Sequence, residues 1–158
     1  MSDFFLALLA ALMSTLGSLL LQVFVSRNSR RMLFDEKRLQ AVVSVRQEVE
    51  IACGRWRGWA ESVLKGFDAE TVMTRKRTAE ECLHGAWYST RVFEMYFPQL
   101  RSDADSMRQM MMAIKDEAEK QVRDGKHFDG SNFDLVGSRV MNLDDAISRA
   151  RKVLALPS

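Results

Sequence analysis

The sequence has few of the residues that interrupt helices or hold metal ions. Its 8 glycines and 2 prolines among 158 residues are too few for an all-β sandwich, which needs frequent turns. Two cysteines and two histidines leave little material for a disulfide framework or a metal site. The net charge of +2 does not indicate a strong polyelectrolyte binder, so nucleic acid is disfavoured as a partner. Length and composition together predict one all-α domain.

Catalytic motifs are also lacking. No glycine-rich phosphate loop, Gly-x-Ser-x-Gly or His-Glu-x-x-His sequence occurs. Glu81 and His84 form one Glu-x-x-His half-motif, but a di-iron site in a bundle needs two such motifs and two further glutamates. Cys82 lies on a different helix face from His84, and Cys53 falls at an apolar position. The sequence therefore predicts a protein that is not an enzyme and binds no cofactor or metal.

The longest uncharged stretch comes first. Residues 4–25 contain no charged side chain, and at about 1.5 Å per residue a helix of this length covers roughly 33 Å. This length predicts a transmembrane helix. A cleavable signal peptide and a buried core helix are the alternatives, and both are disfavoured because their apolar stretches are shorter.

Basic residues follow this stretch and predict its orientation. Arg27, Arg30 and Arg31 are expected to contact lipid headgroups, and none of the residues before them is basic. The positive-inside rule places the N-terminus outside and the rest in the cytoplasm, as in a single-pass protein of the inner (plasma) membrane. The predicted organisation is a short extracytoplasmic N-terminus (1–3), a transmembrane helix (4–25), a basic juxtamembrane segment (26–38) and a cytoplasmic helical bundle (39–156).

One face of the predicted membrane helix carries small or polar residues, namely Ala7, Ala11, Ser14, Ser18 and Gln22. Small residues at four-residue spacing let two helix backbones approach closely, and serine or glutamine hydrogen-bonds across the contact. The face therefore predicts a homo-oligomer. The alternative is that these residues occur here only because alanine and serine are common in membrane helices.

The remainder of the chain reads as helices that pack along their length. Mainly apolar residues recur at 39, 42, 46, 49, 53, 56, 60, 63 and 67, with the alternating steps of three and four that are typical of a coiled coil. Gly66 and Asp68 predict a helix end and a new start, Pro98 ends the second helix and Gly125 the third. A fourth helix is expected over 132–155, with a restart near Asn142 as an alternative. Short connections favour antiparallel neighbours, so we expect an antiparallel bundle of about four helices.

Candidate partner contacts come from two unusual stretches. Residues 54–59 place Arg55 and Arg57 beside Trp59, a combination found at protein contacts and, less strongly favoured here, at single-stranded nucleic acid. The favoured interpretation is nevertheless that the tryptophans lie in the core and that Gly54 and Gly58 let a neighbouring helix pack closely. Three consecutive methionines cannot all face one core, which makes Met112 a further candidate contact.

The layout resembles that of small bacterial proteins made of one N-terminal membrane helix and a cytoplasmic helical bundle, several of which are encoded by phages or antiviral defence loci. The resemblance covers the architecture of the whole chain and rests on no motif, so it assigns no residues. It favours a non-catalytic, membrane-anchored scaffold or adaptor that binds a protein partner or its own copies. The alternative is an oligomerising membrane effector, of the phage defence or exclusion type, that acts through its transmembrane helix.

Overall fold

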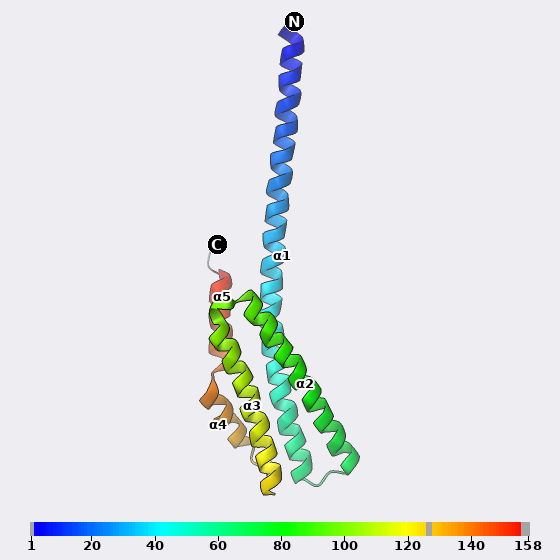
Figure 1. The fold of residues 1–158 in the computed structure, drawn as a ribbon, viewed down its shortest axis with the longest axis vertical. Helices are drawn as coiled ribbons and strands as arrows, with labels where there is room; N and C mark the ends of the chain where they lie inside the picture. Colours follow the sequence, from blue (N-terminus) through cyan, green and yellow to red (C-terminus); the bar gives the residue numbers. More distant parts are fainter. Residues whose placement is uncertain (1, 126–127, 156–158) are drawn as a thin grey trace. The chain divides into compact units, whose positions relative to one another are not determined.

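A computed structural model describes residues 2–125 and 128–155, and its account of side chains leaves out residues 2–17, 19, 20 and 155. Every regular element in these ranges is helical: α1 (Ser2–Leu64), α2 (Ala69–Tyr96), the short 3₁₀ helix η1 (Pro98–Leu100), α3 (Arg101–Asp124), α4 (Gly130–Val140) and α5 (Leu143–Ala155) (Figure 1). The described ranges contain no strand, which confirms the all-α prediction.

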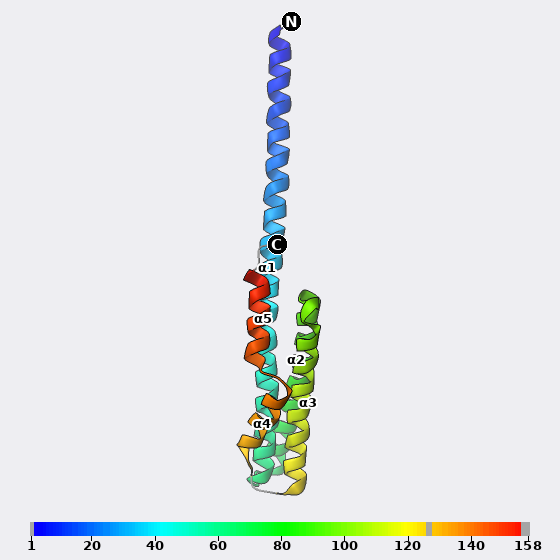
Figure 2. The same ribbon diagram turned by 90° about the vertical axis from the view of Figure 1, so that its left-hand side faces the viewer.

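The chain divides into two compact units, Met1–Lys37 and Arg38–Ser158. The described part of the first unit is helical throughout and belongs to α1. The second unit is a helical bundle, in which the rest of α1, α2 and α3 run in alternating directions (Figure 2). The predicted antiparallel arrangement of these helices is therefore present.

The predicted membrane placement is wrong. In the part of the chain that the structure describes, no helix has both the length and the apolarity to cross a bilayer. The eighteen positions 21–38 of α1 carry seven charged side chains, at 27, 30, 31, 35, 36, 37 and 38, which hydrocarbon does not tolerate. This corrects the single-pass inner-membrane localisation with the N-terminus outside and the bundle in the cytoplasm. The alternative role as a membrane effector depends on the same placement and loses its support with it.

The correction also removes the basis for the lipid contacts predicted at Arg27, Arg30 and Arg31, all of which are exposed. Of the predicted helix-packing face, Ala7, Ala11 and Ser14 lie outside the described side chains. Ser18 and Gln22, the other two members of that face, are exposed.

α1 buries more positions in the bundle core than the predicted coiled-coil pattern contains. The predicted positions Val42, Val49, Cys53, Trp56 and Ala60 are all buried. Val45, Ala52 and Trp59, which lie beside that line, are buried as well, whereas Leu39 and Phe67 are exposed. A helix that several neighbours surround buries a broader arc than a helix in a two-stranded pair, which explains the additional buried residues.

Polar contacts join α1 to each of the other long helices. Arg46 pairs with Asp144 of α5 at 2.9 Å, and Arg57 pairs with Asp134 of α4 at 2.8 Å. The Arg75 guanidinium of α2 donates to the Gly58 carbonyl at 3.2 Å. From α3, the Lys115 ammonium lies 5.7 Å from the centre of the Trp56 ring. The C-terminal part of α1 is thus the central helix of the bundle.

Two predicted helix ends are confirmed by their local geometry. Gly66 has a φ of 71°, a left-handed conformation that glycine adopts without steric cost. The Asp68 carboxylate then accepts a hydrogen bond from the Thr71 amide at 2.8 Å and caps α2. The alternative restart of the last helix is also observed. α4 ends at Val140, and the Asn142 side chain then accepts a hydrogen bond from the Asp144 amide at 3.0 Å.

The start of α3 differs from a sequence-based expectation, because Ser102 and Asp103 are residue types that commonly cap a helix after a proline stop. Instead, η1 leads directly into α3 at Arg101 and no side chain caps it. The Asp103 carboxylate instead accepts two hydrogen bonds from Arg149 of α5, at 2.6 and 3.0 Å. The Asp103 carboxylate therefore forms a tertiary ion pair with Arg149 and does not cap α3.

Gly54 and Gly58 do not serve a close helix contact within the described chain. Nothing lies within 4 Å of the position a Cβ atom would take at either residue. Because alanine loses less backbone entropy than glycine in a helix, we expect Gly54→Ala and Gly58→Ala each to raise the free energy of unfolding by about 0.5–1 kcal/mol in urea titrations. Gly66 is the control: its surroundings are equally open, but its φ of 71° strains an alanine, so Gly66→Ala should lower the free energy of unfolding. A lower free energy of unfolding for Gly54→Ala or Gly58→Ala would show that the space around that residue is not open.

Candidate functional site

Two adjoining hollows lie between α2 and α3 and share Trp87 and Arg108. The first has a volume of about 760 Å³ and is lined by Trp87, Arg91, Glu94, Met95, Pro98, Arg101 and Arg108. The second, of about 640 Å³, is lined by Trp87, Asp105, Arg108, Gln109, Met112, Ala113, Asp116 and Val140. The Arg108 guanidinium lies 6.0 Å from the centre of the Trp87 ring. We call the two hollows together the α2–α3 groove.

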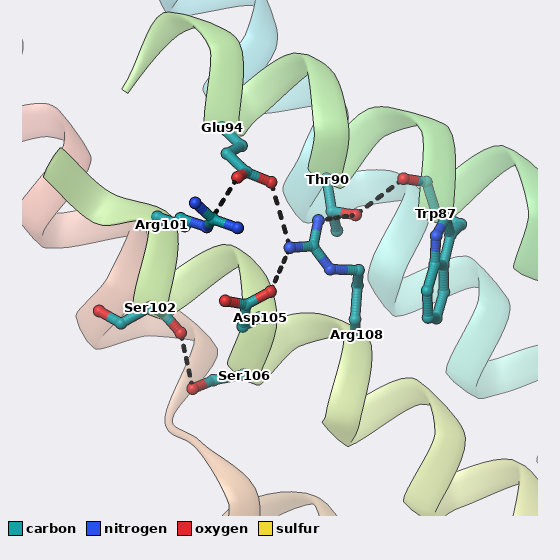
Figure 3. Close-up of polar contacts among 8 residues, drawn as sticks. All are labelled: Trp87, Thr90, Glu94, Arg101, Ser102, Asp105, Ser106 and Arg108. Carbon is teal, nitrogen blue, oxygen red and sulfur yellow. Dashed lines mark hydrogen bonds and ion pairs between the residues drawn. The ribbon is translucent and has the colours of Figure 1, made fainter. Parts of the chain in front are cut away.

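A hydrogen-bond network organises the centre of the groove (Figure 3). Arg108 Nη2 donates to Glu94 Oε2 at 3.1 Å and also to the Asp105 carboxylate. Arg108 Nη1 lies 3.5 Å from Thr90 Oγ1, which itself donates to the Trp87 carbonyl at 2.8 Å. The network joins side chains from both helices, because Glu94 belongs to α2 and Asp105 to α3. It therefore fixes the Arg108 side chain across the groove.

The electrostatics of this network follow from partial burial. The Arg108 side chain is only 13% exposed, and burial alone would lower its pKa. The hydrogen bonds and charges of Asp105 and Glu94 outweigh that effect and raise the pKa of Arg108. The hydrogen bond from Arg108 in turn lowers the pKa of Asp105. Both groups are charged at neutral pH, and each stabilises the charged form of the other.

The charges of the network cancel, and the groove lining holds two further charged side chains, Arg91 and Asp116. Glu94 also forms an ion pair with Arg101, with 3.2 Å between Oε1 and Nε, so two arginines face two carboxylates within the network. Arg91, on the wall of the first hollow, is exposed and forms no ion pair with any described residue. A groove in which the central arginine is already satisfied is poorly suited to a phosphate, which needs several unengaged donors.

Met95, which lines the first hollow, presents a large apolar side chain to solvent and is 78% exposed. Trp, Tyr, Met and Arg are the residue types enriched in the centres of protein–protein interfaces. The groove contains three of these residue types, in Trp87, Met95 and its arginines.

The structure separates the four predicted partner contacts. Met112 is half-buried and lines the second hollow of the groove. Arg55 is exposed on α1, and Arg57 is engaged with Asp134 and lies 5.6 Å from the centre of the Phe133 ring. Trp59 is only 6% exposed and belongs to the core, where it forms an edge-to-face pair with Trp56 at 5.4 Å. Of the predicted set, Met112 alone lies in the groove.

Sequence reasoning missed Trp87, Arg91 and Arg108. One signal was available, because Trp87, Arg91 and Met95 recur at four-residue spacing and share one face of α2. A second signal was the position of Arg108 in the sequence, directly after the apolar Met107 and close to several acidic residues. Neither signal indicates which helix the face will meet, so the groove itself could not be predicted.

A third hollow, of about 640 Å³, lies elsewhere in the bundle and is lined by residues that include Cys53, Arg57 and Asp134. Burial raises the pKa of the Cys53 thiol to about 11, so the thiol stays protonated at neutral pH and is a poor nucleophile. Among the described residues, no group of three or more His, Cys, Asp or Glu side chains is placed to hold a metal ion.

The raised pKa of Cys53 predicts a loss of stability in alkali. The unfolded chain releases the thiol proton near pH 9.0, whereas the folded chain holds it to about pH 11, so rising pH favours unfolding across this window. Between pH 8 and pH 10.5 we expect the free energy of unfolding of the wild type to fall by about 2 kcal/mol more than that of Cys53→Ala. Urea titrations at the two pH values measure this difference. Equal decreases in both proteins would show that the thiol is not buried.

Comparison of the chain with protein-family models, curated proteins and solved structures finds no match. The inference of function therefore rests on the chemistry of the bundle and its α2–α3 groove.

Proposed function

We propose that this chain is a non-catalytic helical scaffold or adaptor that binds a protein partner through the α2–α3 groove. The partner offers apolar side chains to Trp87, Met95 and Met112 and a carboxylate to Arg91. The bundle supplies a rigid surface, and no covalent step takes place on it.

The observation that carries this proposal is the position of Arg108. Its guanidinium is held by Glu94 and Asp105 from two helices and lies over Trp87 before any partner is present. A surface whose central side chains are already ordered loses less conformational entropy when it binds, which favours affinity. Because the network is internally neutral, the groove suits a largely apolar protein segment better than a polyanion such as nucleic acid.

The titratable groups of the bundle support a binding role over catalysis. The Cys53 thiol is protonated at neutral pH, and His84 is exposed on the outer side of α2. The carboxylates at the centre of the groove, Glu94 and Asp105, are both occupied by arginines. A general acid or base needs a group with an unengaged proton position near a substrate, and neither of these two central carboxylates has one.

Site-specific photocrosslinking tests the proposal. We expect the full chain with p-benzoylphenylalanine in place of Met95 to form one discrete adduct in the cells that naturally produce it. The matched control is the same replacement at Met73, which is 68% exposed on the same helix but about 33 Å away along it. No adduct is expected from position 73.

The adduct must also depend on the chemistry of the groove. Adding Arg91→Glu to the chain that carries the crosslinker at 95 should reduce the yield of adduct at least about tenfold, since a buried contact between like charges replaces an attraction. Adducts of equal yield at both positions, or an adduct at 95 that survives Arg91→Glu, would exclude the groove as the binding site.

A further inference from the structure

The coiled-coil register of the bundle continues upstream along α1. Val42, Val49 and Trp56 follow this register and are buried in the core. Counting back from Leu39 through Asp35 in the same steps of three and four gives Met32, Asn28, Val25 and Leu21. These four positions all belong to α1 and share one face of that helix. We call Leu21, Val25, Asn28 and Met32 the upstream seam.

No described residue of the chain covers the upstream seam. Leu21 is 68% exposed, Val25 52% and Met32 66%. Phe24, which flanks the seam, is also largely exposed, whereas Arg27 and Arg30 lie on other faces of the helix. A contiguous row of exposed apolar side chains, bordered by charged ones, is typical of a surface that another molecule covers.

We propose that the upstream seam pairs, parallel and in register, with the same seam of a second copy of this chain. In heptad terms Val25 and Met32 occupy a positions, and Leu21 and Asn28 occupy d positions. Arg31 then falls at a g position and Glu36 at the following e position, and both side chains are exposed. In a parallel pair, each g residue lies opposite the e residue five positions later in the other helix. Arg31 of each copy therefore meets Glu36 of the other.

Asn28 adds a reason for this particular alignment. In the parallel, in-register pair the two Asn28 side chains meet at one layer and hydrogen-bond to each other. A shift by one heptad would instead place the Asn28 amide of one copy against Leu21 of the other, where it has no hydrogen-bond partner. A single polar layer of this kind lowers the stability of a coiled coil and specifies its register. This interface uses none of the α2–α3 groove, so it is independent of the proposed partner.

Disulfide trapping in the full chain tests the alignment. With copper-phenanthroline as oxidant and a non-ionic detergent to prevent aggregation, we expect Met32→Cys to form a disulfide between the two residues 32. The control Arg30→Cys occupies the opposite side of the helix, at an f position, and should react at least about tenfold more slowly. Mass spectrometry of proteolytic fragments identifies the 32–32 bond and separates it from any bond of Cys53 or Cys82. Equal rates at residues 30 and 32 would overturn the proposal.

A charge exchange tests the contact between Arg31 and Glu36. Sedimentation equilibrium should give a dissociation constant about tenfold higher for Arg31→Glu and for Glu36→Arg, since each change places two like charges together. The double variant Arg31→Glu/Glu36→Arg should return to within about threefold of the wild type. A wild-type chain that is monomeric at all concentrations would overturn the proposal, and so would a double variant as weak as the single ones.

Discussion

Replacing Trp56 by alanine should lower the free energy of unfolding by about 4 kcal/mol, the largest effect we expect from a single substitution. The side chain is 1% exposed and pairs edge-to-face with Trp59 in the centre of the bundle. Its removal loses the free energy gained when a large apolar surface leaves water. It also creates a cavity whose walls lose their packing contacts. Urea denaturation followed by circular dichroism measures the loss.

The matched variant Trp56→Phe separates packing from hydrogen bonding. The indole Nε1 of Trp56 has no hydrogen-bond partner among the described residues. Phenylalanine keeps an aromatic ring and removes an N–H group whose bond is not made, so we expect less than half of the alanine effect. If both variants were equally unstable, the indole N–H would have to be making a bond that contributes to the core.

Replacing Arg108 by methionine should lower the free energy of unfolding by about 2 kcal/mol. Methionine keeps most of the side-chain length but leaves Glu94 and Asp105 facing each other without the guanidinium between them. Arg108 is mostly buried but its two partners are partly exposed, so removing it leaves carboxylates that lose their compensation and regain only some of their contact with water. Urea titrations at neutral pH measure the difference between the two proteins.

Two controls attribute the Arg108 effect to charge. The double variant Arg108→Met/Glu94→Leu removes both partners and should recover most of the loss, because well-packed apolar residues replace such pairs at little cost. Lowering the pH should also reduce the difference between the wild type and Arg108→Met. The lowered pKa of Asp105 stabilises the wild type above about pH 3.8, and this contribution disappears as pH falls through the lowered value. A difference that is independent of pH and of Glu94 would mean that only packing was lost.

The secondary structure of the bundle could be predicted largely from local signals. Gly66, Asp68 and Pro98 act on their own neighbours in the chain, so their consequences are visible in the sequence. The core positions of α1 also follow from a periodic pattern. Asp103 shows where local reasoning fails, because its carboxylate is used by Arg149, which lies 46 positions further along the chain.

The candidate site was less predictable than the fold. Trp59 stands out in the sequence beside two arginines, yet it belongs to the core, whereas Trp87 has ordinary neighbours and lies at the centre of the groove. The difference arises from the pairing of helices: α2 and α3 meet across Arg108, and no pattern within either helix reveals its partner. The membrane prediction failed for a related reason, since an apolar run was taken as sufficient evidence of its surroundings.

Amide hydrogen exchange of the full, unbound chain is the most direct test of the central claim, which is that the α2–α3 groove exists as an ordered surface before a partner binds. We expect the amides of residues 86–95 and 104–112 to exchange at least about a thousandfold more slowly than in an unstructured peptide, as slowly as those of the α1 core at 49–60. Rapid exchange in the two groove segments, with the α1 core still protected, would show that the groove is not ordered and would contradict the account.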